Sequence, residues 1–179
     1  MLEDFALLVL RLVVGGLLLG HGSQKAFGRF GGYGFAGTSY FMGESLRLRP
    51  AKLWTALAAA SELSGGLLLV TGFLSPLGSL GVIAAMLTGA ALAHWPRFWV
   101  TENGIEYPLV LAAVASALAI AGPGAFSLDA ALGIQLPIVF TFVLGLGAVV
   151  IGTVIALETR APAAPVAAGG SGIPLDKAA

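Results

Sequence analysis

Hydrophobic residues fall into long runs along this chain, and shorter polar connections separate the runs. The runs cover residues 5–20, 51–73, 77–95, 106–122 and 134–157. None shows the period-two alternation of a half-buried strand, and several approach the about 20 residues that a helix needs to cross a bilayer. A backbone surrounded by lipid must satisfy its own hydrogen bonds, which favours helices. The pattern predicts an all-α membrane protein with five transmembrane helices.

The connections between the runs constrain how these helices pack. The turn at residues 74–76 is so short that the second and third helices must be antiparallel neighbours. The connection at residues 23–50 is long, polar and rich in glycine, and part of it could form a short interfacial helix with its aromatic rings at head-group depth. After residue 160 the chain is rich in Ala, Pro and Gly, which predicts a disordered tail.

The composition indicates that lipid surrounds the protein, and it excludes several kinds of chemical site. Of the 179 residues, 58% are hydrophobic and 10% are charged, whereas a soluble domain carries about 25% charged residues. The net charge is zero, so nothing suggests nucleic-acid binding. The chain has no cysteine, which excludes disulfides, dithiol exchange, iron–sulfur clusters and thiolate metal sites within it. Residues 1–4 are acidic rather than basic, so we expect the first run to be retained as a spanning helix.

Basic residues indicate how the helices are oriented. With five spans, the Lys and Arg residues at the ends of the runs all fall on one side of the membrane. The other side holds the acidic residues 1–4, the turn at Pro76 and the loop at Asp129. The positive-inside rule therefore predicts an outside N-terminus and a cytoplasmic C-terminus. The basic residues are Lys25, Arg29, Arg47, Arg49, Lys52, Arg97, Arg160 and Lys177.

Two charged residues lie deep inside apolar runs. Arg11 is in the first run, and Glu62 is in the second, at the start of the sequence Glu-Leu-Ser-Gly-Gly. Both fall near mid-depth, so we expect them to pair across two helices. An unpaired charge there costs about 2.5–3.5 kcal/mol on insertion scales, and pairing offsets that cost. The pair is a candidate catalytic pair, and it could equally be a structural ion pair that locks two helices together.

Antiparallel alternation brings five more polar residues to one membrane face. His21 and Lys25 end the first run, His94 ends the third, and Glu106 and Tyr107 begin the fourth. On a helical wheel, Lys25 lies on the same face as the buried arginine. The sequence therefore predicts a polar funnel that leads from this surface toward the buried pair.

Each of these residues also has a plainer interpretation. His21 and His94 could be hydrogen-bonding groups at the interface, Lys25 could simply extend to the surface, and Glu106 could favour a helix start. Two His and one Glu raise the possibility of a metal site. No His-x3-His or His-x2-Glu spacing is present, so no metal is expected. Asp129, on the opposite side, is typical of a turn or a helix cap.

Together these motifs resemble the DoxX family of small bacterial and archaeal membrane proteins. The resemblance spans residues 7–132 and implies a four-helix membrane bundle of the DoxX type in residues 1–133. Residues 134–158 would then add a fifth C-terminal transmembrane helix, and 159–179 would form the tail. The implied location is a bacterial cytoplasmic (inner) membrane. The resemblance rests on Arg11, Gly20-His21-Gly22, Lys25, Glu62 with Gly65-Gly66 and Gly72, Glu106-Tyr107-Pro108, Gly122-Pro123-Gly124 and Ser127-Leu128-Asp129.

The resemblance also implies a function. The family takes its name from a subunit associated with thiosulfate:quinone oxidoreduction, and relatives have been tied to oxidative-stress complexes. It implies an integral membrane subunit of a quinone-linked redox complex, with a protein partner in the bilayer. Without cysteine, the chain would bind a quinone rather than hold a covalent cofactor. Whether the chain has catalytic activity alone stays open.

In that interpretation the quinone carbonyl oxygens need hydrogen-bond donors, and the reaction needs groups that exchange protons. His21, Lys25, His94 and Arg11 would donate to the head group, and Glu106 and Tyr107 would also bind it. Glu62 or Glu106 would accept or deliver protons. Two alternatives stay open. One is a non-enzymatic scaffold that anchors a soluble redox enzyme, and the other is a small-molecule or proton permease. The permease is disfavoured because the chain shows no internal repeat.

Overall fold

A computed structural model describes residues 1–162, and within them the chain is helical with no strand. The predicted helical class is thus confirmed. The longer helices are α1 (Leu2–Phe27), α3 (Ala51–Thr71), α4 (Ser75–Gly89), α5 (Glu106–Ala121) and α7 (Ile138–Glu158). The shorter elements are η1 (Arg29–Gly31), α2 (Gly34–Glu44), η2 (Ala90–His94), η3 (Val100–Glu102) and α6 (Leu128–Leu132).

Within residues 1–162, three helices are long and apolar enough to cross a membrane. They are α3 with 21 residues, the continuous helix Ser75–His94 with 20, and α7 with 21. α5 is apolar but has only 16 residues, fewer than the about 20 that span a bilayer. The helices thus support a membrane protein, whereas the count of five spans and the division at residue 133 stay predictions.

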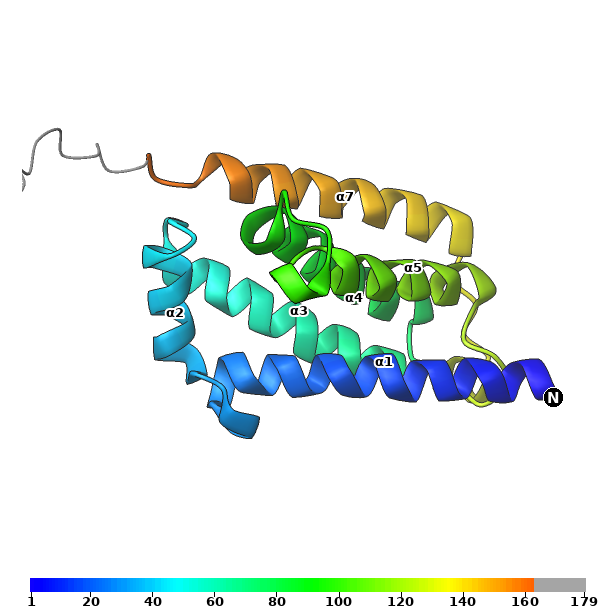
Figure 1. Ribbon diagram of the computed structural model, residues 1–179. Helices are drawn as coiled ribbons and strands as arrows, with labels where there is room; N and C mark the ends of the chain where they lie inside the picture. Colours follow the sequence, from blue (N-terminus) through cyan, green and yellow to red (C-terminus); the bar gives the residue numbers. More distant parts are fainter. Residues whose placement is uncertain (163–179) are drawn as a thin grey trace, which may run out of the picture.

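The helices form three layers (Figure 1). α1 and α3 lie side by side in the first layer, and α4 and α5 lie together in the second. α7 covers α4 and α5 on the side opposite α1, and α2 lies across the ends of α1 and α3. The long connection predicted to hold a short helix contains α2. α4 is therefore the central helix, with α3 on one side and α7 on the other.

Glycines let α1, α3 and α4 approach closely. A Cβ atom on Gly15 would lie 2.8 Å from the carbonyl oxygen of Gly66, and one on Gly65 would lie 3.0 Å from the Cα atom of Gly81. Small residues at such contacts allow backbone-to-backbone packing between membrane helices. Gly16 and Gly20, which have the one-turn spacing typical of such contacts, have no atom within 4 Å of a built Cβ. The contact line on α1 therefore runs through Gly15.

α6 and the residue before it close the end of the molecule that holds the α3–α4 turn. The Asp129 carboxylate accepts hydrogen bonds from the backbone N–H groups of Leu74, at 2.8 Å, and Ser75, at 2.9 Å. These donors lie at the start of α4, where N–H groups have no partner within the helix. Ser127 caps α6 by accepting from the N–H of Ala130 at 3.1 Å. The interpretation of Asp129 as a cap is confirmed.

The end of α7 is joined to the loop before α3, in what we call the C-terminal clip. The N–H of Arg49 donates to the carbonyl of Thr159 at 3.2 Å, and the N–H of Ala161 donates to that of Arg47 at 2.8 Å. Arg160 Nε adds a bond of 3.1 Å to the carbonyl of Leu46. Of the tail expected to be disordered at 159–179, these first residues are thus hydrogen-bonded, and 163–179 lie outside the described residues.

Candidate functional site

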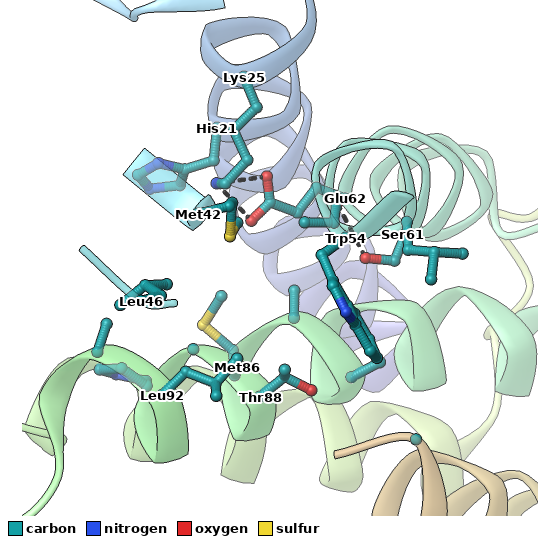
Figure 2. Close-up of a pocket in the computed structure, with 18 of the residues that line it drawn as sticks. His21, Lys25, Met42, Leu46, Trp54, Ser61, Glu62, Met86, Thr88 and Leu92 are labelled. Carbon is teal, nitrogen blue, oxygen red and sulfur yellow. Dashed lines mark hydrogen bonds and ion pairs between the residues drawn. The ribbon is translucent and has the colours of Figure 1, made fainter. Parts of the chain in front are cut away.

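A cavity of about 670 Å³ lies between the three layers, at the end of the molecule that holds α2. Its volume falls within the about 300–1,000 Å³ typical of small-molecule sites. Apolar side chains form most of its walls, and Figure 2 shows the few polar groups among them. The polar side chains that line it are His21, Lys25, Ser61, Glu62, Thr88, His94 and Tyr107.

An ion pair between α1 and α3 is the strongest polar feature of this central cavity. Lys25 Nζ lies 2.7 Å from both Glu62 Oε1 and Glu62 Oε2. The Glu62 side chain is only 6% exposed, whereas the Lys25 side chain is 26% exposed and faces the cavity. Removing one partner of such a pair leaves the other charge buried and uncompensated. Lys25 therefore makes a buried carboxylate possible at this position.

The predicted pairing of Arg11 with Glu62 is wrong. Arg11 is buried, at 1% exposure, but no hydrogen bond or ion pair joins it to Glu62 in the part of the chain that the structure describes. Its guanidinium binds carbonyls at the end of α3 and in the loop after α5. Carbonyls in the last turn of a helix lack their usual partner within the helix, and that of Leu69 also accepts the N–H of Gly72 at 3.2 Å. The acceptors are Leu69 at 3.1 Å, Val70 at 3.4 Å, Phe126 at 2.7 Å and Pro123.

The register between α1 and α3 explains the correction. Gly15 packs against Gly66, and the helices run antiparallel, so Arg11 lies level with the last turn of α3. Lys25 lies about four helical turns farther along α1, or roughly 21 Å. Its side chain points back toward the N-terminus of its helix, as helical side chains do, and meets Glu62. The shared face of Arg11 and Lys25 was predicted, but the register was not.

The two histidines of the cavity are held in defined orientations. His94 Nδ1 lies 2.8 Å from the carbonyl oxygen of Asn103. A carbonyl oxygen only accepts, so we infer that Nδ1 carries the proton and that Nε2 of neutral His94 is an acceptor. His21 Nδ1 lies 3.1 Å from Gln24 Oε1. Each ring therefore has one nitrogen fixed by the protein and one not used in these bonds.

His94 ends a π-type turn, η2, that follows α4. The N–H of Trp95 closes this turn by donating to the carbonyl of Ala90 at 2.9 Å. Single turns of this kind are rare and are often found at functional sites. The turn brings Leu92 and His94 to the cavity wall.

Glu106 does not belong to the polar cluster. Its Oε2 accepts a hydrogen bond from the backbone N–H of Val100 at 2.8 Å, and the residue does not line the cavity. It is the first residue of α5, which agrees with its plainer interpretation as a helix start. Tyr107 does line the cavity, although it is 40% exposed. The structure thus brings together five predicted residues, whose roles in binding stay predictions: His21, Lys25, Glu62, His94 and Tyr107.

Sequence reasoning missed most of the apolar wall. Trp54, Ala58 and Ser61 lie along the face of α3 that leads to Glu62, at spacings of four and three residues. A helical wheel of α3 places these three residues on one face, which adjoins Glu62. The Trp54 indole Nε1 is buried and has no hydrogen-bond partner among residues 1–162. The residues from α7 had no such signal, because that run is uniformly apolar.

Comparison with known proteins gives one result. The DoxX family model matches residues 6–95, half of the 179-residue chain. No curated protein and no solved structure matched the chain. The matched segment runs from α1 to the residue after η2 and includes the Lys25–Glu62 pair, whereas α5 and α7 lie outside it. Within residues 1–162, no three His, Asp or Glu side chains are grouped so that they could hold a metal ion.

Proposed function

This chain belongs to the DoxX family, and from that premise we propose that it is the membrane subunit of a quinone-linked redox complex. The quinone head group would bind in the central cavity beside Lys25 and Glu62. One observation carries the proposal: a charged pair lies within a largely apolar cavity of about 670 Å³ in a membrane protein. The bacterial inner membrane, the outside N-terminus and a protein partner belong to the same proposal.

The donors in the cavity suit quinone carbonyl oxygens, which only accept hydrogen bonds. An ammonium group has three N–H donors, and two of those on Lys25 go to Glu62. The third can bind a quinone carbonyl. His94 or His21 in its protonated form could donate to the second carbonyl. The site thus offers a donor on α1 and, in the protonated form of His94, another on η2, on different walls of the cavity.

Reduction of a quinone to a quinol takes up two electrons and two protons. Lys25 and Glu62 together hold an exchangeable proton at hydrogen-bond distance. They could deliver the two protons in turn to the reduced head group, and His21, which also lines the cavity, could pass each replacement proton to them from the membrane surface. The electrons would come from the partner protein, because a chain without cysteine has no thiol couple of its own.

The test is mass spectrometry of quinones retained by protein extracted from its own membranes in mild detergent. We expect the wild type to retain an isoprenoid quinone and the double variant Lys25→Met/Glu62→Leu to lose it. The double variant removes both charges, so neither is left buried alone. A matched control is Glu44→Gln/Arg49→Gln, which removes an exposed ion pair of 3.4 Å outside the cavity.

A wild-type protein that carries no quinone, and binds none when it is supplied, would contradict the proposal. If such a protein arrives with a soluble redox enzyme, the result favours the scaffold alternative. Retention of quinone by the double variant would instead show that the head group binds away from Lys25 and Glu62.

A further inference from the structure

The last helix, α7, lies outside the family match but supplies one wall of the central cavity. Its contributions are Ala148, Val149 and Gly152. Figure 2 shows Lys25 and Glu62 on one side of the cavity and the α4 residues Met86 and Thr88 on the other. α7 packs against α4. A ligand whose head group lies at the ion pair therefore has its remaining part directed toward the α4 and α7 wall.

Two glycines on that wall leave space that no neighbouring atom fills. Gly89 at the end of α4 and Gly152 in α7 both line the cavity, and a Cβ atom on either would have no atom within 4 Å. Some glycines elsewhere are required by close packing: a Cβ on Gly145, also in α7, would clash with Leu80 Cδ1, whereas Gly16 and Gly147 are as open as these two. What sets Gly89 and Gly152 apart is that the open space beside them belongs to the cavity.

The volume of the cavity also exceeds what a head group needs. A single six-membered ring is bound in a cavity of about 150 Å³, whereas this one measures about 670 Å³. Most of the space is therefore available to an apolar chain. The wall at Gly152 is held in place by a hydrogen bond of 2.9 Å between Thr88 Oγ1 on α4 and Thr153 Oγ1 on α7.

We infer that α7 forms the binding wall for the isoprenoid chain of the ligand, and that Gly89 and Gly152 determine which chains fit. The inference rests on the proposed function, because it takes the quinone head group to lie at Lys25 and Glu62. It assigns head-group binding to the segment that matches the family model, and chain selection to a helix that lies outside that segment.

The test compares Gly152→Leu with Gly147→Leu in the full-length purified protein. Gly147 is also in α7 and also has no atom within 4 Å of a built Cβ, but it does not line the cavity. Leu is a better helix former than Gly, so neither change should weaken α7 itself. The measurement is the affinity for a quinone with a long isoprenoid chain and for the same head group without a chain.

We expect Gly152→Leu to weaken binding of the long-chain quinone by roughly 10–200-fold, the usual effect of steric changes in an apolar pocket. Binding of the chainless quinone should stay at the wild-type level, and Gly147→Leu should leave both unchanged. Gly89→Leu, on the α4 part of the wall, should reproduce the loss and serves as the second variant if Gly152→Leu does not fold.

The outcomes separate the two proposals. The role of α7 in binding the isoprenoid chain is overturned if the wild type binds both quinones with equal affinity. It is also overturned if Gly152→Leu and Gly89→Leu bind the long-chain quinone as tightly as Gly147→Leu does. In both cases the proposed head-group site is retained. If the wild type binds neither quinone, the proposed function fails, and the inference that rests on it fails too.

Discussion

Arg11 and Lys25 are both basic, both lie on α1 and both point toward α3, but their surroundings differ. Arg11 donates to four backbone carbonyls and is 1% exposed. Lys25 binds one carboxylate and borders a cavity. The carbonyls at a helix end carry partial negative charge, so they stabilise the guanidinium without an ion-paired carboxylate, and the charge of the buried Asp129 adds to this. A buried basic side chain therefore indicates a ligand-binding site only when one of its N–H donors is not used within the protein and a cavity lies beside it.

The largest loss of stability is expected when the contacts of Arg11 are removed. Arg11→Leu removes the donor side chain from four carbonyls of α3 and of the loop after α5; the carbonyl of Leu69 keeps the N–H of Gly72, and each buried carbonyl left without a donor costs about 1–3 kcal/mol. We expect a lower yield of folded protein and a thermal unfolding midpoint well below that of the wild type in the same detergent. The protein that does fold should bind quinone with wild-type affinity. Normal stability combined with lost quinone binding would reverse the roles assigned to Arg11 and Lys25.

Lys25→Met should be the next most harmful change. It leaves the Glu62 carboxylate buried without its partner, a situation that typically costs about 3–5 kcal/mol. The expected result is a clear loss of thermal stability, and Lys25→Met/Glu62→Leu should recover most of it while leaving quinone unbound. A full double-mutant cycle by thermal unfolding measures this coupling. Strictly additive effects of the two single changes would show that the pair does not form.

Asp129→Ala tests the capped end of the molecule, and it also removes the carboxylate whose charge acts on Arg11. Loss of a helix N-cap typically costs about 0.5–2 kcal/mol, so we expect a modest fall in the unfolding midpoint. Quinone affinity should not change, because Asp129 does not line the cavity. Hydrogen exchange at the N–H groups of Leu74 and Ser75 should become faster. Protection equal to that of the wild type would argue against the cap.

The smallest effect is expected for Thr153→Val. It removes the hydrogen bond between α7 and α4 but keeps a side chain of similar shape. Hydrogen bonds between membrane helices average about 0.6 kcal/mol, so the unfolding midpoint should fall only slightly. Because Gly152 is the next residue, any loosening of the wall should appear as weaker selection between long and short quinone chains. A loss of stability as large as that of Lys25→Met would give α7 a greater part in the fold than we assign.

The helices could be predicted closely from the sequence. The run at 51–73 became α3 (Ala51–Thr71), and the run at 77–95 became the helix Ser75–His94, because apolar stretches end where Pro and Gly interrupt them. α5 came out shorter than a full span.

The candidate site could be predicted only in part. Alternation along the chain brought His21, Lys25 and His94 to one end, as observed. The partner of Glu62 could not be predicted, because helix register depends on which glycines meet, and the chain has 26 glycines. The wall from α7 could not be predicted either, since a run that is apolar on every face gives no direction.

The C-terminal clip has a mechanical consequence. α7 is joined to the rest of the chain at its start by the segment after α6, and at its end by the hydrogen bonds of Thr159, Arg160 and Ala161 to the loop before α3. A helix fastened at one end can swing aside like a lid, but one fastened at both ends can only bow or slide. The wall that α7 forms therefore stays in place at both of its ends. A molecule that reaches the cavity has to pass beside α7 rather than displace it.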